Sequence, residues 1–200
     1  MKIRCGLMPD VVVKEVERLS PQWFKSVGVR AVAFDVDGTL MNYHEHKVEP
    51  EITRYLESLR TAGLKLFIVS NAYFGRAKEL EQLFGCFGAT VLTPGGVYTG
   101  ERFESKNLGS KPKPSMLREA AQLAKLKSGE KIAMVGDQMF KDVLSANKLD
   151  VAVSVLVARR GKGDFIGIKL LQRPLETLIR TFLPNVPSRW YDFPEEPTFI

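Results

Sequence analysis

Three aspartates follow short apolar segments that have the length of buried strands. Asp35 is the last residue of the segment 30–35, and Asp37 comes two residues later. Asp137 directly follows the segment 131–136. The carboxyl ends of parallel strands share one edge of a sheet, where ligands bind. Three carboxylates in one cleft repel one another unless a cation neutralises them, and an all-oxygen site favours Mg²⁺. Because a carboxylate near a metal can still attack phosphorus, this pattern indicates phosphoryl chemistry.

Further polar residues would complete such a site. Lys111 stands just before a predicted helix and supplies the positive charge that a transferring phosphoryl group needs. Ser70 ends the second apolar segment and offers a hydroxyl to a phosphate oxygen, while Asp142 is placed to orient Lys111 or a water. Alone, Asp137 and Ser70 could equally cap helices, and Lys113 competes with Lys111. Their joint occurrence in this order favours the site.

The neighbours of these residues are expected to support them. Gly38 lets the chain turn tightly, and Thr39 can hydrogen-bond locally. His44 and His46 resemble a metal pair, but a His-x-His pattern without a third ligand is a weak signal. We therefore expect both histidines in a loop at the edge of the site.

The elements that must position these side chains alternate along the chain. Apolar segments of strand length alternate with amphipathic segments of helical period, which predicts an α/β fold with a central five-stranded parallel sheet. Strands are expected at 30–35, 64–70, 89–92, 131–136 and 151–157. Helices are expected at 11–19, 21–24, 50–62, 77–84, 114–124, 140–148 and 170–183.

Segments outside this pattern divide the chain into a core and its additions. Residues 1–29 are expected to form a helical segment that packs on a core of residues 30–183. The Gly- and Pro-rich segment 93–110 has room for a small hairpin, and residues 184–200 form a Pro- and aromatic-rich tail.

Bulk composition excludes several classes of protein. The 200 residues are 44% hydrophobic and 26% charged, typical of a globular domain. The net charge of +6 suits phosphorylated ligands or anionic lipid surfaces, yet no basic run indicates a nucleic-acid partner. Cys5 and Cys86 form neither a zinc motif nor a disulfide framework. No segment reads as a signal peptide or a membrane span, so we expect a cytoplasmic protein, at most peripheral to a membrane.

Four of these segments resemble the motifs of the haloacid dehalogenase-like (HAD) superfamily. The segment 35–40 (DVDGTL) resembles motif I, and Ser70-Asn71 resembles motif II. Lys111 lies in a Lys-Pro-x-Pro setting similar to motif III, and the segment 136–142 (GDQMFKD) resembles motif IV. The likeness covers about residues 30–157 and implies a three-layer Rossmann-like fold.

The resemblance also implies roles for individual residues. It makes Asp35 the nucleophile and Asp37 the general acid and base of a phosphatase that forms a phospho-aspartate. It implies that Mg²⁺ binds to Asp35, to the backbone carbonyl of Asp37 and to Asp137. Gly38, Thr39 and Asn71 would then contact the substrate, with Asp142 behind Lys111.

The spacing of the motifs leaves no room for a cap domain, and at most a small flap fits between motifs II and III. In this respect the chain resembles the capless subfamily IIIA. The segments 7–10 (LMPD) and 19–21 (LSP) ahead of Gly28 resemble the N-terminal pattern of YqeG-type proteins, which are related to phosphatidylglycerophosphate phosphatases. This likeness implies a large phosphorylated substrate such as a lipid headgroup. Capless members can also use a neighbouring subunit as a lid, so an oligomer is one alternative.

Other functions stay open on the sequence. The same superfamily includes phosphatases of soluble sugar phosphates and nucleotides, and phosphotransferases or mutases that use the same phospho-aspartate. A non-catalytic HAD-like binding module is a further alternative, although it would not need Asp37 together with Ser70 and Lys111. Mutases commonly need a cap to exclude water, which this chain has little room for.

Overall fold

One mixed β-sheet forms the centre of the molecule. The computed structural model describes residues 6–43, 45–100, 102–161, 173–183, 185–187 and 192–200. The strands run β1 (Val11–Val13), β2 (Val29–Phe34), β3 (Lys65–Val69), β4 (Thr90–Thr93), β5 (Gly96–Thr99), β6 (Arg102–Ser105), β7 (Lys131–Gly136), β8 (Ala152–Val157) and β9 (Thr198–Phe199). Their spatial order is β6-β5-β4-β3-β2-β7-β8-β1-β9. All neighbours from β4 to β1 pair in parallel, and the outer strands β5, β6 and β9 pair antiparallel.

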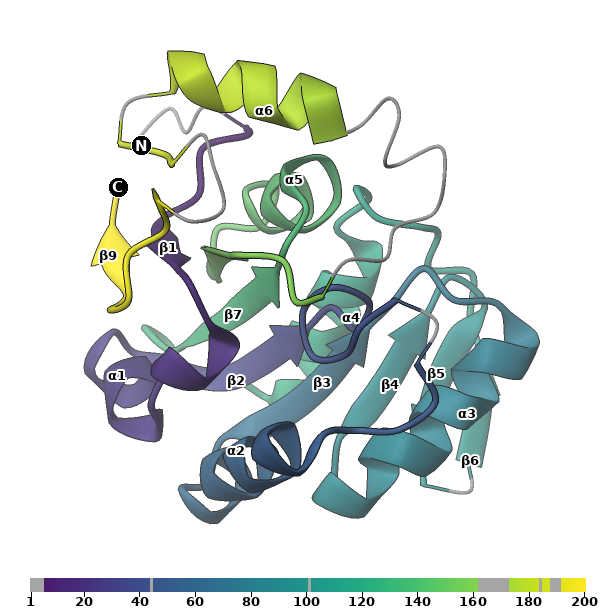
Figure 1. The fold of residues 1–200 in the computed structure, drawn as a ribbon. Coiled ribbons are helices and arrows are strands. Elements are labelled where there is room, and N and C mark those ends of the chain that lie inside the picture. Colours follow the sequence, from purple (N-terminus) through teal and green to yellow (C-terminus); the bar gives the residue numbers. More distant parts are fainter. Residues whose placement is uncertain (1–5, 44, 101, 162–172, 184, 188–191) are drawn as a thin grey trace.

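Helices cover both faces of this sheet, as Figure 1 shows. The α-helices are α1 (Pro21–Ser26), α2 (Pro50–Thr61), α3 (Phe74–Phe84), α4 (Ser115–Ala124), α5 (Leu144–Ala146) and α6 (Arg173–Phe182). Short 3-10 turns occur at η1 (Val16–Arg18) and η2 (Gly85–Phe87), and η3 (Met139–Val143) is π-helical.

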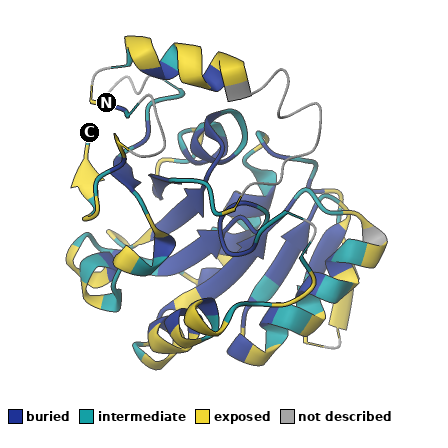
Figure 2. Cartoon of the chain, viewed as in Figure 1, coloured by how far each residue is buried: buried dark blue, intermediate teal, exposed yellow. Residues whose placement is uncertain are grey.

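The alternation of side chains along β2 explains the layers. Val32 and Phe34 point into a core shared with α1, α2 and α3, whereas Ala31 and Ala33 face the core under α4 and α5. Successive strand residues face opposite sides, so a strand covered on both sides is apolar throughout. Figure 2 shows the central strands buried and the outer sides of the helices exposed.

The expected five-stranded parallel sheet is therefore only the middle of a larger one. The five predicted strands correspond to β2, β3, β4, β7 and β8, which lie side by side in the sheet. The sheet has nine strands because β1 joins next to β8, β9 joins next to β1, and the hairpin β5–β6 joins next to β4. The hairpin predicted within segment 93–110 thus extends the sheet instead of standing apart as a flap.

The N-terminal helix predicted at residues 11–19 is wrong. Val11–Val13 is strand β1, buried next to β8, and a 3-10 turn follows it. Three consecutive β-branched residues favour an extended chain, and β8 offers them a parallel partner. The next helix is confirmed, because Ser20 caps α1 by accepting a hydrogen bond from the backbone N–H of Trp23.

The C-terminal tail packs against β1, at the edge of the sheet that the N-terminal segment forms. Strand β9 pairs antiparallel with β1, and Phe193 is buried with Val12. Figure 1 shows β9 (yellow) beside β1 (purple), with α6 at the top of the view. No helix in the described ranges combines the length and apolarity needed to cross a membrane.

Candidate active site

The ends of three neighbouring strands supply the centre of the site. Asp35 follows β2, Ser70 follows β3 and Asp137 follows β7. Strand β2 pairs in parallel with both β3 and β7, so the three polar residues meet at one edge of the sheet. The backbone N–H of Asp35 donates to the carbonyl of Val135 at 2.9 Å, which holds the first strand end against the third.

Lys111 lies between two carboxylates at this edge. Its ammonium donates to Asp35 Oδ1 at 2.5 Å and to Asp142 Oδ1 at 2.7 Å. The side chain of Lys111 is only 2% exposed. Asn71 holds the Lys111 backbone from both sides: its side-chain carbonyl accepts from Lys111 N–H at 2.7 Å, and its amide donates to the Lys111 carbonyl at 3.2 Å. Motif II residues therefore position the lysine predicted from motif III.

These contacts determine the charge states at the centre. Burial alone would lower the pKa of Lys111, but the carboxylates of Asp142 and Asp35 raise it above its ordinary value, so the ammonium stays charged. Burial raises the pKa of Asp142 to about 7; Lys111 opposes this rise, and the carboxylates of Asp35 and Asp137 add to it. In the absence of another cation, the cluster holds more negative charge than Lys111 can neutralise.

The donor set fits a hard divalent cation. Asp35, Asp137 and Asp142 each offer an oxygen, and these oxygens lie within 4.8 Å of one another. Mg²⁺ prefers carboxylate oxygens and keeps waters in its remaining positions. Gly38 leaves space for this cluster, because a Cβ there would lie 2.7 Å from Asp137 Oδ2, and its φ of +86° also favours glycine.

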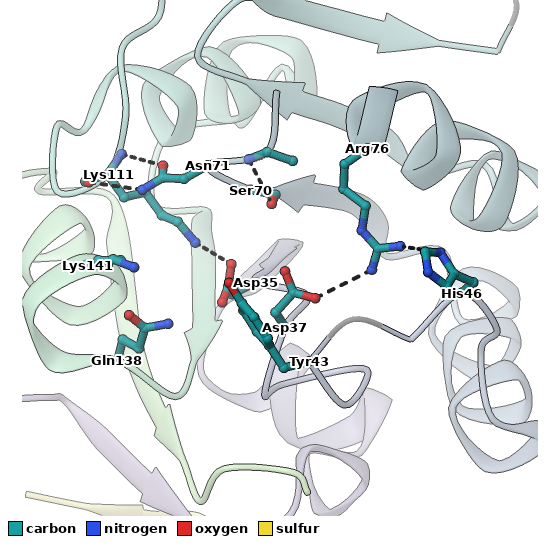
Figure 3. Close-up of a pocket in the computed structure, with 11 residues that line it drawn as sticks. Asp35, Asp37, Tyr43, His46, Ser70, Asn71, Arg76, Lys111, Gln138 and Lys141 are labelled. Atoms are coloured by element: carbon teal, nitrogen blue, oxygen red, sulfur yellow. Dashed lines mark hydrogen bonds and ion pairs between the residues drawn. The ribbon is translucent and has the colours of Figure 1, made fainter. Parts of the chain in front are cut away.

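An open cleft of about 490 Å³ lies over this centre. It is lined by Asp35, Asp37, Tyr43, His46, Ser70, Asn71, Ala72, Arg76, Lys111, Gln138 and Lys141. Figure 3 shows Arg76 and His46 on one side of the two aspartates, with Lys111, Gln138 and Lys141 on the other. The cleft thus has two differently built sides.

On the first side, Arg76 connects the site to α3. The guanidinium of Arg76 lies 3.4 Å from Asp37 Oδ1 and 2.9 Å from Glu79. Glu79 also contacts His46, and hydrogen bonds from His46 and Arg76 lower the pKa of Glu79. Asp37 is therefore held next to a guanidinium that has a second carboxylate behind it.

The structure brings most of the predicted site residues together. Asp35, Asp37, Ser70, Asn71 and Lys111 line the cleft, while Asp137 and Asp142 are buried beneath it. Between the competing lysines, Lys111 is buried in the centre and Lys113 is exposed.

Other predicted residues lie at the margin or elsewhere. Gly38 serves the metal cluster and is not in the cleft lining, and Thr39 lines a neighbouring depression with Arg160. His46 lies at the edge of the cleft as expected, and His44 lies outside the described residues.

Sequence reasoning missed Arg76, Lys141 and Tyr43 as lining residues. Arg76 lies on the helix that follows motif II, and Lys141 lies within motif IV, next to Asp142. A reading of motif positions that included the variable residues inside and just after each motif would have identified the two cations. Tyr43 carries no such signal in the sequence.

Comparison with known proteins identifies the family. A family model described as haloacid dehalogenase-like hydrolase matches residues 41–150, more than half of the chain. The chain belongs to the haloacid dehalogenase-like hydrolase family. The matched part of this hydrolase contains Ser70, Lys111 and Asp137 and begins after Asp35 and Asp37.

One relative and one solved structure complete the comparison. "Probable phosphatase YqeG" of Bacillus subtilis (strain 168) is 26% identical over 159 residues, covering 80% of this chain and 82% of the relative. A solved structure from Eubacterium rectale is 23% identical with a TM-score of 0.33, covering 39% of this chain and 30% of that one. The first match confirms the likeness to YqeG expected for this HAD-like hydrolase, and the second is too partial to carry an argument.

Proposed function

We propose that this HAD-like hydrolase is a Mg²⁺-dependent phosphomonoester phosphatase that forms a phospho-aspartate on Asp35. The observation that carries the proposal is the arrangement of Asp35: it lines an open cleft, Lys111 contacts its carboxylate at 2.5 Å, and Asp37 and Ser70 lie alongside. The name of the relative, "Probable phosphatase YqeG", supports the same class of reaction.

The residues divide the chemistry into two balanced steps. In the first, an oxygen of Asp35 bonds to phosphorus as the bond to the alcohol breaks, and Asp37 gives the leaving oxygen a proton. In the second, water attacks phosphorus and gives a proton to Asp37. The bond between Asp35 and phosphorus breaks, so phosphate is released and the Asp35 carboxylate is restored. Lys111 and Ser70 hold the phosphoryl oxygens. Mg²⁺, held by Asp35, Asp137 and the Asp37 carbonyl, would supply further positive charge, while Asp142 stays paired with Lys111.

The substrate we propose is large or anchored, with a phosphorylated lipid headgroup such as phosphatidylglycerophosphate as the leading example. Support comes from the open cleft, since the described residues contain no separate cap domain over it. The N-terminal segment adds no support for membrane contact, because Val12, Val16 and Phe24 are buried in the fold. A soluble sugar phosphate or nucleotide is the second candidate.

A substrate panel tests both levels of the proposal. The full chain is assayed with an aryl phosphate, sugar phosphates, nucleotides and the lipid phosphate in mixed micelles, with Mg²⁺ or with excess chelator. We expect Mg²⁺-dependent release of phosphate and the highest kcat/KM for the lipid. A clear preference for a soluble metabolite would overturn only the lipid assignment. Full activity in chelator would overturn the metal mechanism.

A further inference from the structure

Lys141 is a cation on the wall of the cleft that the proposed chemistry does not use. It belongs to η3, lines the cleft and is partly buried. Figure 3 shows it on the same side as Gln138 and Lys111. Among the residues that the structure describes, Lys141 has no hydrogen bond or ion pair through its ammonium.

The other cations of the cleft are neutralised by the protein. Lys111 contacts Asp35 and Asp142, and Arg76 contacts Asp37 and Glu79. A charged side chain that is partly removed from water is costly unless it gains a partner of opposite charge. Lys141 therefore differs from Lys111 and Arg76 in having its charge available to a bound ligand.

The π-helical turn η3 holds Lys141 in this position. The backbone carbonyl of Gln138 accepts from the N–H of Asp142 at 2.8 Å and of Val143 at 3.4 Å. Asp142 turns inward to Lys111, and its second oxygen accepts from the Gln138 N–H at 3.1 Å. Single π-helical turns are rare in proteins overall, and those that occur often lie at functional sites. Here the turn sends Asp142 into the buried centre and its neighbour Lys141 into the cleft.

The scissile phosphate already has its partners under the proposed function, namely Lys111, Ser70 and the metal. The cleft of about 490 Å³ is much larger than one phosphate and has room for the leaving group. We infer that Lys141 binds a second anionic group on the leaving alcohol, so that the enzyme prefers phosphomonoesters whose leaving group is itself negatively charged. A phosphodiester and a carboxylate share this chemistry. The inference rests on the proposed phosphatase function of the same site.

A matched set of soluble esters tests this inference. The substrates are alkyl phosphates, each with the same short linker, that end in a hydroxyl, a carboxylate, a methyl phosphodiester or a trimethylammonium group. The readout is the ratio of kcat/KM for each charged substrate to kcat/KM for the hydroxyl substrate. In the wild type we expect both anionic ends to raise this ratio and the cationic end to lower it.

The variants assign the preference to one side chain. Lys141→Gln should reduce the ratio for the anionic ends about tenfold, mainly through KM, because one charge-assisted contact is lost. Lys141→Arg should retain most of the preference for the anionic ends, because it keeps the positive charge. Lys127→Gln, which removes the same charge from an exposed position that does not line the cleft, is the control for general electrostatic attraction.

Each outcome decides one claim. A larger fall for the phosphodiester end than for the carboxylate end would support Lys141 and favour a lipid-type headgroup, and the reverse would favour a carboxylate. An equal loss on every substrate would overturn the inference and assign Lys141 to the scissile phosphate. An unchanged ratio in Lys141→Gln would also overturn it. If the wild type hydrolyses none of the esters or the phosphatase panel, the proposed function itself has failed.

Discussion

The buried centre of the site and the rim of the cleft handle charge in different ways. The centre comprises Asp35, Lys111, Asp137 and Asp142, all at most 7% exposed. Lys111 contacts the carboxylates of Asp35 and Asp142, so the protein itself supplies a partner of opposite charge for these three groups. The rim comprises Arg76, His46 and Lys141, which lie at the opening where a leaving group would sit.

This difference separates catalytic power from selectivity. Charges that are buried and fixed interact strongly with one another, so changes at the centre should affect every substrate. Charges at the rim are more hydrated and meet only the outer part of a ligand, so their effects should be smaller. Within the rim, Arg76 forms an ion pair with Asp37, whereas Lys141 forms none with the described residues. Substitutions of these two residues should therefore have different effects on activity.

The largest effect is expected at the nucleophile. Asp35→Asn should reduce kcat at least about 10³-fold for every phosphomonoester, because an amide cannot form the acyl phosphate. The fold should persist, since Lys111 keeps its contact with Asp142. Steady-state kinetics and thermal unfolding measure the two parts. Near-normal turnover in this variant would refute the phospho-aspartate mechanism.

The metal is the next test of the centre. Asp137→Asn should raise the Mg²⁺ concentration needed for half-maximal activity about tenfold or more, because one ligand loses its charge. Mg²⁺ should also raise the Tm of the wild type slightly, since the ion binds only the folded cluster. Titrations of activity and Tm with Mg²⁺ check both. A variant with unchanged Mg²⁺ dependence would remove Asp137 from the ligand set.

A smaller effect is expected from Arg76. Arg76→Gln should lower kcat about tenfold on all substrates alike, because Asp37 loses the guanidinium beside it at 3.4 Å. The pH profile of kcat should shift in the same variant, since Asp37 is the proposed acid and base. Arg118→Gln, at an exposed position on α4, is the matched control. If the loss occurs only on substrates with anionic leaving groups, Arg76 shares the role inferred for Lys141.

The smallest effect concerns stability and pH in the metal-free protein. The pKa of Asp142 is raised to about 7 in the folded state from 3.8, so the folded state keeps a proton that the unfolded chain releases. This proton stabilises the folded state fully below about pH 4, and the stabilisation is lost as the pH rises toward about 7. Relative to Asp142→Asn, the wild type should therefore lose unfolding free energy as the pH rises over this range.

Urea denaturation of both proteins in chelator, at a series of pH values, measures this difference. Added Mg²⁺ should flatten it, because the cation favours ionised carboxylates. A difference that grows in the opposite direction with pH would mean that Lys111 dominates the charge state of Asp142.

Local sequence determined the parts of this protein that depend on short-range chemistry. Apolar segments of strand length predicted β2, β3, β4, β7 and β8, because strands covered on both faces are apolar throughout. The polar residues at their ends were predicted to meet, since parallel strands end at one edge. Asp35, Ser70 and Asp137 do meet there.

Tertiary structure decided what depends on partners distant in the chain. The spacing of Val12, Val16 and Leu19 suited a helix, yet pairing with β8 made Val11–Val13 a strand. Helix α6 exposes Phe182 and buries Glu176, and the buried Glu176 accepts a hydrogen bond from the backbone N–H of Phe140. No local pattern reveals such a contact.

The same reason explains the cleft. The sequence by itself left Lys111 and Lys113 as competitors, and only the hydrogen bonds from Asn71 and the carboxylates of Asp35 and Asp142 distinguish them. Whether a cation is neutralised or available to a ligand depends on which carboxylates the fold brings within ion-pair distance. Local sequence therefore determined the chemical groups and the strand ends that carry them, and the tertiary structure decided how those groups are paired.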